Sequence, residues 1–454
     1  MLSDYIQLIW INRQLNLKTP LEKCPVGLDQ NNPRDQMAVG LARLELYNKL
    51  IIPSQNIINL MSDRTHNNHK PNCQVCGNQA RIVNVGSFPI AGYTCNSKEE
   101  SLEQPSIEMN LMTCASCGMV KYEWFDEAEA ILDRLYSGHF STYYFTEKMS
   151  NYMNWFVEDI SERFKLDQNS TILELGCNSG RMLKMFKEKV GCDVLGVEPS
   201  KTFRPLWNDW HLNVINDYFG EKISNQLKNK KFDVILFRHV FEHIPSPAPF
   251  FKSVAALADN DTTIVIEVPY LKSVIEKQRV ENISYSHLNY YTIKSINEIA
   301  KKHHIGIINY QLVDTDGGSI IIYLQKNKTT PKDIIDNISH KDVENLVANI
   351  SKIKTRLNET INKYNKEEVV GYGAGAKGQH LLHLLELENR IDYVIDDTPE
   401  LNGKYIPGTT VKICSPDHIE NSGIKAVVNL IPTHSEAIRE KVSNQYEFID
   451  PIND

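Results

Sequence analysis

The sequence lacks an excess of positive charge, a long hydrophobic run and a basic, apolar leader. Its 454 residues include 57 acidic and 49 basic side chains, a formal net charge of −8. This balance argues against nucleic acid or an anionic membrane as the main partner. No apolar run approaches the roughly 20 residues that a membrane-spanning helix needs. The residues after Met1 do not form a secretory signal, so we expect a cytoplasmic protein.

Cysteine is also sparse, with nine residues in the chain. Disulfides are not expected in the cytoplasm, so these residues are interpreted as metal ligands or buried thiols. Four of them form two CxxC pairs, each followed by glycine: Cys73 with Cys76, and Cys114 with Cys117. Four thiolates at this spacing predict a structural Zn²⁺ site with no open coordination position. A redox pair and a nucleic-acid-binding ribbon are the weaker alternatives, because the motif occurs twice and carries no basic cluster. The other cysteines are predicted to be buried thiols: Cys24, Cys95, Cys177, Cys192 and Cys414.

A glycine motif in residues 172–180 (ILELGCNSG) predicts a cofactor site. An apolar strand runs through Glu174 into a tight turn, and a helix is expected to start at Arg181. About twenty residues on, a second strand ends in Glu198, which is placed to accept hydrogen bonds from ribose hydroxyls. The motif lacks the third glycine that a pyrophosphate requires, and S-adenosylmethionine (SAM) has no phosphate. We therefore predict a SAM-dependent methyltransferase that binds the cofactor through five residues of this region: Glu174, Gly176, Asn178, Gly180 and Glu198.

Two further segments are predicted to line the cofactor site. After a short strand at 212–215, Asp217 can pair with the adenine amino group and Phe219 can cover its ring, although Asp217 as a helix cap is nearly as good an interpretation. Arg238 and His239 follow the strand 232–237, at the edge where open α/β sheets bind their ligands. For His243, a site role and a structural role are about equally favoured.

The alternation of short apolar strands with helical segments predicts an α/β fold with a parallel sheet covered by helices on both faces. The strands are expected at 171–175, 193–197, 232–237 and 263–268, closed by 307–312 and 319–325.

The chain is predicted to have five parts. Residues 1–68 are expected to form one or two helices of unknown role, residues 69–125 the zinc module and residues 126–330 the methyltransferase domain. Residues 331–364 carry an apolar stripe at helical spacing, which predicts a linking helix; a coiled-coil dimer seam is the weaker alternative. Residues 365–454 are predicted to form a Rossmann-like domain.

This last domain opens with Gly-x-Gly-x-x-Gly after the strand 368–372. The glycines are Gly373, Gly375 and Gly378, and Asp396 and Asp397 follow the next strand. The strand–loop–helix context predicts phosphate binding at the helix N-terminus. A domain that merely packs on the catalytic one is the alternative.

The order of these modules, with the motifs LELGCNSGR, EVPYL, HLNY, GGS and GYGAGAKG, resembles the NDP-hexose C-methyltransferases. The resemblance runs from about residue 70 to the C-terminus. It implies a class I SAM-methyltransferase fold, a nucleotide-linked 4-keto-6-deoxy sugar as substrate and a C-terminal module that holds the nucleotide diphosphate. Asp397 belongs to that implied substrate site with the glycine loop and Lys377.

The resemblance also implies a histidine base that removes the proton next to the ketone, and the matching residue is His287. Ser284 and Ser286 replace a tyrosine and a glutamate of the family, and Tyr285 and Tyr290 are predicted to shape the acceptor pocket. An imidazole suits this step because its pKa lies near neutrality. The replacements leave O-methylation open, and a zinc-stabilised protein that binds a nucleotide sugar without turnover is a further alternative. The sequence gives no oligomeric state.

Overall fold

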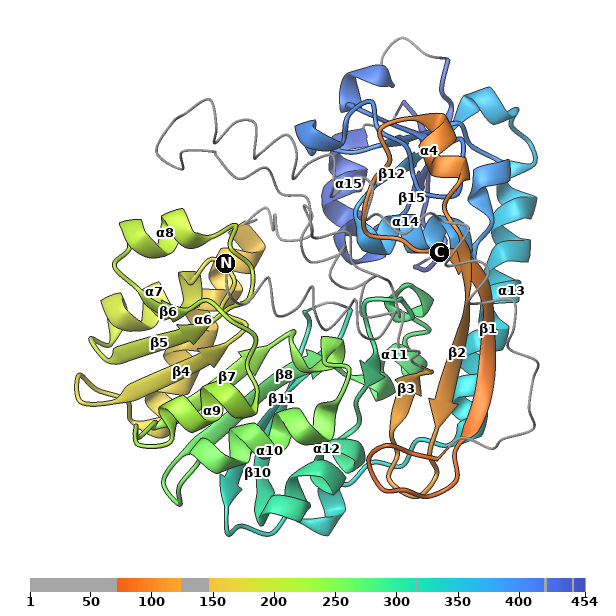
Figure 1. Ribbon diagram of the computed structural model, residues 1–454. Helices are drawn as coiled ribbons and strands as arrows, with labels where there is room; N and C mark the ends of the chain where they lie inside the picture. Colours follow the sequence, from red (N-terminus) through yellow and green to blue (C-terminus); the bar gives the residue numbers. More distant parts are fainter. Residues whose placement is uncertain (1–71, 124–146, 316, 420–422, 443–444, 454) are drawn as a thin grey trace, which may run out of the picture. The chain divides into compact units, whose positions relative to one another are not determined.

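The computed structural model describes residues 72–123, 147–315, 317–419, 423–442 and 445–453 (Figure 1). The chain divides into two compact units, residues 1–66 and 67–454. The predicted helices of residues 1–68, and Cys24 with them, lie outside the described residues. All that follows concerns the second unit.

The central element is a seven-stranded sheet with the order β10-β11-β8-β7-β4-β5-β6. Its strands are β4 (Thr171–Leu175), β5 (Asp193–Val197), β6 (Asn213–Ile215), β7 (Val234–Arg238), β8 (Thr263–Pro269), β10 (Ile305–Val313) and β11 (Ser319–Lys326). The strands from β6 to β8 are parallel, and β11 is antiparallel to both of its neighbours. The strand order reverses between β4 and β7, so the ends of these two strands meet at the crevice where such sheets bind ligands.

Alternate residues of the central strands pack into two separate cores. Leu173 and Ile235 belong to a core with α9 and α10, whereas Ile172 and Val234 belong to a core with α6 and α7. Because successive side chains of a strand point to opposite faces, uninterrupted apolar strands need helices on both faces, which Figure 1 shows. The helices are α6 (Glu147–Phe164), α7 (Arg181–Lys189), α8 (Arg204–Asp209), α9 (Glu221–Leu227), α10 (Pro247–Leu257), α11 (Leu271–Glu276) and α12 (Ile293–Ala300). The predicted α/β methyltransferase sheet is confirmed.

A second, four-stranded sheet has the order β1-β2-β3-β9. It contains β1 (Arg81–Pro89), β2 (Ser106–Thr113), β3 (Val120–Tyr122) and β9 (Asn289–Tyr290), with α4 (Lys98–Leu102) in the β1–β2 connection. All three pairings are antiparallel. The fourth strand comes from the loop of His287, so the cysteine-bearing segment and the candidate base share one sheet.

A single long helix, α13 (His340–Ile361), follows the methyltransferase sheet in the sequence. Its buried residues are the six of the predicted stripe: Val343, Leu346, Ile350, Ile353, Leu357 and Ile361. The helix packs against β1, α11 and the turn Val280–Asn282, and a Ser339–Asp342 capping box fixes its start. The stripe is therefore buried within one chain and does not need a coiled-coil partner.

The C-terminal sheet is entirely parallel, with the order β14-β13-β12-β15-β16. Its strands are β12 (Val369–Tyr372), β13 (Tyr393–Ile395), β14 (Lys412–Cys414), β15 (Ala426–Asn429) and β16 (Glu447–Ile449), with helices α14 (Ala376–Leu384) and α15 (Ser435–Val442). This is the predicted Rossmann-like arrangement. Across the described part of the chain, no helix is both long and apolar enough to cross a bilayer.

Candidate active site

The turn after β4 is shaped by glycines in the left-handed region. Gly176 has φ +70°, and a Cβ there would lie 2.4 Å from a methyl carbon of Val240. Gly180 has φ +77°, and its Cβ would lie 2.5 Å from a methyl carbon of Leu212. Asn178 between them is also left-handed, at φ +50°. Helix α7 starts at Arg181 as predicted, and no side chain caps its N-terminus, so its first N–H groups can serve an anionic group.

Glu198, directly after β5, anchors the turn from the neighbouring strand. Its Oε2 accepts the N–H of Asn178 at 2.9 Å, and its Oε1 accepts the N–H of Ser200 at 2.8 Å. Burial raises the pKa of Glu198, and these two backbone hydrogen bonds oppose that rise. Each oxygen keeps one acceptor direction, which suits the ribose hydroxyls of a nucleoside.

Glu174 lies beside this turn and is itself buried. Burial raises its pKa to about 8, with Arg238 opposing the rise and Glu198 adding to it. Within the described residues, its Oε2 has no hydrogen-bond partner. A buried carboxyl oxygen without a partner is costly, and a cationic ligand group such as the SAM ammonium would satisfy it.

Asp217 and Phe219 follow β6 at the same edge of the sheet. Asp217 pairs with Lys222 at 2.6 Å, and this lysine lowers the pKa of the aspartate. The N-cap of α9 is Gly220, so the alternative interpretation of Asp217 as the helix cap is wrong. Phe219 is partly buried and packs edge-on against Phe250 at 5.4 Å between ring centroids. Their contact with adenine stays a prediction.

A buried ion pair joins the C-terminal ends of the neighbouring strands β7 and β8. Arg238 donates to Glu267 at 2.5 Å, and its guanidinium lies 4.5 Å from the ring centroid of Phe156. Glu267 also accepts bonds from Tyr152 and Thr315, both onto Oε1. Burial would raise the pKa of Glu267, but the positive charge of Arg238 lowers it well below the ordinary value. Arg238 is therefore the counter-ion of Glu267, and its contact with SAM stays a prediction.

His239 follows Arg238 with a left-handed φ of +51°. Its Nε2 lies 3.2 Å from Glu267 Oε1, and its Nδ1 lies 3.4 Å from Glu242 Oε1. The ring therefore sits between two buried carboxylates at the carboxyl end of the sheet. This position agrees with the predicted cleft-lining role, although direct contact with the cofactor stays a prediction.

Three potential proton-transfer groups come together one turn further on. Ligand atoms of Glu242, His243 and His287 all lie within 4.8 Å of one another. His287 is 5 % exposed, and its ring centroid is 5.2 Å from that of His243. The N–H of Leu288 donates to the carbonyl of Glu242 at 2.8 Å, which joins the two loops directly.

The two predicted pocket tyrosines are both buried beside this cluster. The hydroxyl of Tyr285 lies 2.8 Å from the carbonyl of Phe88 and 2.6 Å from that of Ile107. Tyr290 lies 6.4 Å from His287 between ring centroids, and its hydroxyl accepts the N–H of Ser284 at 3.1 Å. Tyr285 thus fastens the loop to the β1–β2 hairpin, and a role of either tyrosine in acceptor binding stays a prediction.

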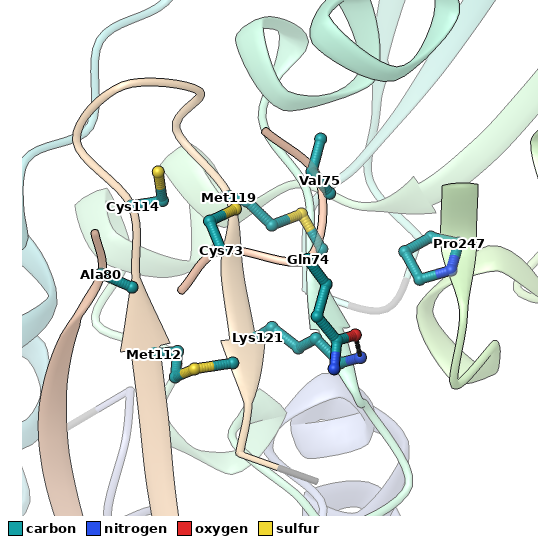
Figure 2. A pocket seen from close by; sticks show the side chains of 9 residues that line it. All are labelled: Cys73, Gln74, Val75, Ala80, Met112, Cys114, Met119, Lys121 and Pro247. Carbon is teal, nitrogen blue, oxygen red and sulfur yellow. Dashed lines mark hydrogen bonds between the residues drawn. The ribbon is translucent and has the colours of Figure 1, made fainter. Parts of the chain in front are cut away.

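The structure brings the ligand atoms of the four predicted metal-binding cysteines together, and Figure 2 shows two of these residues, Cys73 and Cys114. Cys73 Sγ lies 3.4 Å from Cys117 Sγ, and Cys76 Sγ lies 3.5 Å from Cys114 Sγ. Four sulfurs bound tetrahedrally at 2.3 Å would lie about 3.8 Å apart, so the residues fit Zn²⁺ after a small expansion. The hydrogen bond with Cys117 lowers the pKa of Cys73 to about 5, which favours the thiolate that binds metal.

A buried lysine connects this module to the catalytic loops. Lys121 on β3 is 3 % exposed. It donates to Gln74 (Figure 2) and, at 2.6 Å, to the carbonyl of Pro245. Burial lowers its pKa to about 8. Pro245 follows the turn of Glu242 and His243, so the cysteine module contacts both loops of the cluster.

In the C-terminal domain, the glycine loop is partly occupied by the protein itself. The N–H of Ala374 donates to Asp396 at 2.7 Å. A Cβ on Gly373 would lie 2.2 Å from Ile431, and one on Gly378 would lie 2.1 Å from the carbonyl of Gly373. Nothing lies within 4 Å of the Cβ position of Gly375. Of the three glycines of this loop, Gly375 is therefore the one that faces space a ligand could enter.

The two charged residues predicted for this site have protein partners. Asp397 accepts from Tyr372 at 3.0 Å and pairs with Lys441 at 2.7 Å. Lys377 donates to Asn282 of the methyltransferase domain at 3.1 Å. Their predicted role in substrate binding is untested.

The sequence prediction did not include Glu242 or Glu267 among the site residues. Both lie in segments that it had singled out, next to His243 and before Val268-Pro269. Buried carboxylates are rare unless paired, so an acidic residue inside an apolar strand end was the available signal.

Comparison with known families covers both large domains. Residues 145–304 match the family described as "Methyltransferase domain", and residues 314–449 match the "C-methyltransferase C-terminal domain". The curated protein C-methyltransferase NovU of Streptomyces niveus is 23% identical over 406 residues, which cover 84% of this chain and 95% of NovU. These matches indicate a SAM-dependent methyltransferase.

Two solved methyltransferase-like structures are similar to part of the chain. The 1,6-didemethyltoxoflavin-N1-methyltransferase of Burkholderia thailandensis is 15% identical, covers 48% of this chain and 96% of its own, and has a TM-score of 0.35. The cyclopropane synthase MmaA2 of Mycobacterium tuberculosis is 12% identical, covers 39% of this chain and 84% of its own, and has a TM-score of 0.32. At these scores the likeness carries no further argument.

Proposed function

From the premise that this chain is a SAM-dependent methyltransferase of the C-methyltransferase family, we propose that it methylates a carbon next to the ketone of a nucleotide-linked 4-keto-6-deoxy sugar. His287 is the base. The observation that carries this proposal is the position of His287, which is buried beside Glu242 and His243 on a loop next to the cofactor sheet. The similarity to a C-methyltransferase and the matched C-terminal domain support carbon as the acceptor.

The reaction proceeds in two balanced steps. First, an imidazole nitrogen of His287 takes the proton next to the ketone, and the electron pair of the broken C–H bond remains on the substrate as an enolate. The enolate carbon then attacks the SAM methyl group, the methyl–sulfur bond breaks, and its electron pair stays on sulfur as S-adenosylhomocysteine. Because the sulfonium is already a good leaving group, the protein mainly aligns the reactants and excludes water.

The other predicted sites belong to the same proposal. Glu174, Gly176, Asn178, Gly180 and Glu198 hold SAM, with Asp217, Phe219, Arg238 and His239 around them. Zn²⁺ bound by the four cysteines stabilises the module that carries β3, and it supplies no chemistry to the reaction. Gly375 and Lys377 contact the diphosphate of the substrate at the N-terminus of α14, where the loop faces open space.

Methylation of a sugar hydroxyl is the second candidate. The observation that favours it is the pair Ser284 and Ser286, whose hydroxyls lie 3.0 Å apart where the family carries a tyrosine and a glutamate. In that case His287 would deprotonate the acceptor hydroxyl.

Labelled SAM and a panel of nucleotide-linked sugars in heavy water separate these candidates. We expect the wild-type enzyme to exchange deuterium next to the ketone without SAM and to place the label on carbon. His287→Asn should lower both reactions by about 10²–10⁴-fold, the usual contribution of a general base, while SAM affinity stays unchanged.

His304→Asn is the matched control, because His304 is exposed and its left-handed φ of +56° suits asparagine. Label on oxygen without exchange would support the second candidate. Full activity of His287→Asn would show that the base lies elsewhere.

A further inference from the structure

Glu242 is a buried carboxylate that the proposed reaction has not yet used. It is 2 % exposed, and within the described residues its Oε2 has no hydrogen-bond partner. Its Oε1 lies 3.4 Å from His239 Nδ1 and 3.9 Å from His243 Nε2. A buried carboxyl oxygen without a partner is costly, and a positive charge formed nearby would satisfy it.

The hydrogen bond of His243 fixes which of its nitrogens is basic. His243 Nδ1 lies 2.5 Å from the carbonyl oxygen of Ser286, and a carbonyl can only accept. The proton of a neutral His243 is therefore on Nδ1, and Nε2 presents its lone pair toward Glu242. The carbonyl of Ser286, the residue before His287, thus fixes the orientation of the His243 ring.

The other carboxylate of this region is already occupied. Glu267 accepts bonds from Tyr152, Arg238 and Thr315. The loop Ser284–Asn289, which carries His287, contains no acidic residue. Glu242 is therefore a carboxyl group beside His287 that still has an oxygen able to accept a hydrogen bond. The hydrogen bond from the N–H of Leu288 to the main-chain carbonyl of Glu242 holds the two loops together.

We propose that Glu242 is a positioning residue whose carboxylate stabilises the imidazolium formed on His287 when it takes the substrate proton. The inference rests on the proposed function of His287 as base. The proton moves from the acceptor carbon to an imidazole nitrogen of His287, and the new positive charge is then balanced by Glu242. No oxidant or further reactant is needed.

The groups that face Glu242 come from four segments of the chain. They are His239 after β7, His243 in the turn that carries Glu242, His287 on the loop before β9, and Tyr291 after β9. The ring of Tyr291 stacks on that of Phe241 with 4.5 Å between centroids. Tyr291 stays neutral because burial holds its pKa well above the ordinary value, so it offers no charge to Glu242.

The test is the titration of His287 in the full-length enzyme, followed by NMR with labelled histidine. The resonance is assigned by its loss in His287→Asn. An opposite charge at this distance shifts a pKa by about one unit or more, so Glu242→Gln should lower the pKa of His287 by about one unit. It should also slow deuterium exchange about tenfold and leave SAM affinity unchanged. Glu242→Asp should restore most of both.

Glu388→Gln is the matched control, since Glu388 is a partly buried carboxylate of the C-terminal domain whose Oε2 also has no partner among the described residues. An unchanged His287 titration in Glu242→Gln would overturn the proposal. Should that variant not fold, the same titration in Glu242→Ala decides the question, because alanine also removes the charge, and an unchanged His287 pKa there would equally overturn the proposal. Exchange that survives in His287→Asn would instead contradict the base itself.

Discussion

At the scale of single residues, burial decides the charge of the side chains around the cofactor turn. Glu174 lies within the apolar strand β4 and Glu198 directly follows β5, and burial raises the pKa of each. Glu198 is held by two backbone N–H groups, whereas one oxygen of Glu174 has no partner among the described residues. The two carboxylates therefore differ in what they can offer a ligand.

This difference predicts proton release when SAM binds. The pKa of Glu174 is about 8 in the free protein, so the carboxyl is mostly protonated at pH 7. A contact with the SAM ammonium favours the carboxylate, so binding should release up to one proton, and affinity should rise as pH increases from 6 to 8. Calorimetry in two buffers of different ionisation enthalpy measures this release. Glu174→Gln should bind more weakly and without pH dependence, and equal proton release in both proteins would contradict the assignment.

Gly176→Ala should disrupt the cofactor turn. The new Cβ would lie 2.4 Å from Val240, and a left-handed φ of +70° costs about 1 kcal/mol or more for alanine. We expect SAM affinity to fall at least about tenfold, measured by calorimetry. Gly220→Ala is the control, because nothing lies within 4 Å of its Cβ position and its φ of −179° is ordinary extended backbone. Equal affinities of the two variants would show that the turn does not approach the ligand.

At the scale of elements, the pairing of β3 with β9 connects metal binding to the acceptor loop. Val120 pairs with Tyr290 and Lys121 with Asn289, while the N–H of Tyr122 donates to the carbonyl of Leu288. Strand β9, which follows His287, is therefore part of the same sheet as β1–β3, the strands next to the cysteine pairs. The cofactor turn, between β4 and α7, lies in a different sheet.

Loss of the metal should therefore affect the acceptor loop more than the cofactor site. In Cys76→Ser combined with Cys117→Ser, we expect one metal ion fewer per chain, a lower melting temperature and slower deuterium exchange, while SAM affinity changes little. Metal analysis, thermal melting and calorimetry measure these three effects. Cys414→Ser is the control, a buried thiol outside the metal group. Unchanged stability and metal content in the double variant would contradict a structural zinc site.

The same elements show what the sequence could predict. Strands β4 and β5 start and end at the predicted residues, because an apolar run ended by an acid or glycine is a local signal. The stripe of α13 was local in the same way. The pairing of Val120 with Tyr290 joins residues far apart in the chain, and no local pattern encodes it. The approach of Glu242 to His287 also joins residues far apart in the sequence, so the histidine could be predicted and the neighbouring carboxyl group could not.

At the scale of the whole folded unit, the β1–β2 hairpin touches both large domains. Ser101 donates to the carbonyls of Ile406 and Thr409 in the C-terminal domain, and the N–H of Gly92 donates to Gln379 of α14. On the methyltransferase side, the hairpin receives the hydroxyl of Tyr285. The contacts of three domains therefore converge around α14.

Two histidines of α14 are buried at this convergence. His380 lies 6.1 Å from Phe88 and 5.9 Å from Tyr285 between ring centroids. Burial lowers the pKa of His380 to about 3 and that of His383 to about 4. Both rings are therefore neutral in the folded protein, whereas an unfolded histidine binds a proton below about pH 6.5.

This difference makes the folded unit sensitive to acid. Below about pH 6.5 the unfolded chain binds more protons than the folded one, so the free energy of unfolding should fall as pH decreases toward 4, by up to about 1.4 kcal/mol per pH unit for each histidine. His380→Phe keeps an aromatic ring between Phe88 and Tyr285 without a titrating group. It should reduce the pH dependence of the free energy of unfolding by the contribution of one histidine. Urea unfolding between pH 5 and 7 measures the slope. His211→Asn is the control, because His211 is exposed and left-handed at φ +51°. The same slope in His380→Phe as in the wild type would show that His380 takes up its proton without breaking the contacts of the three domains.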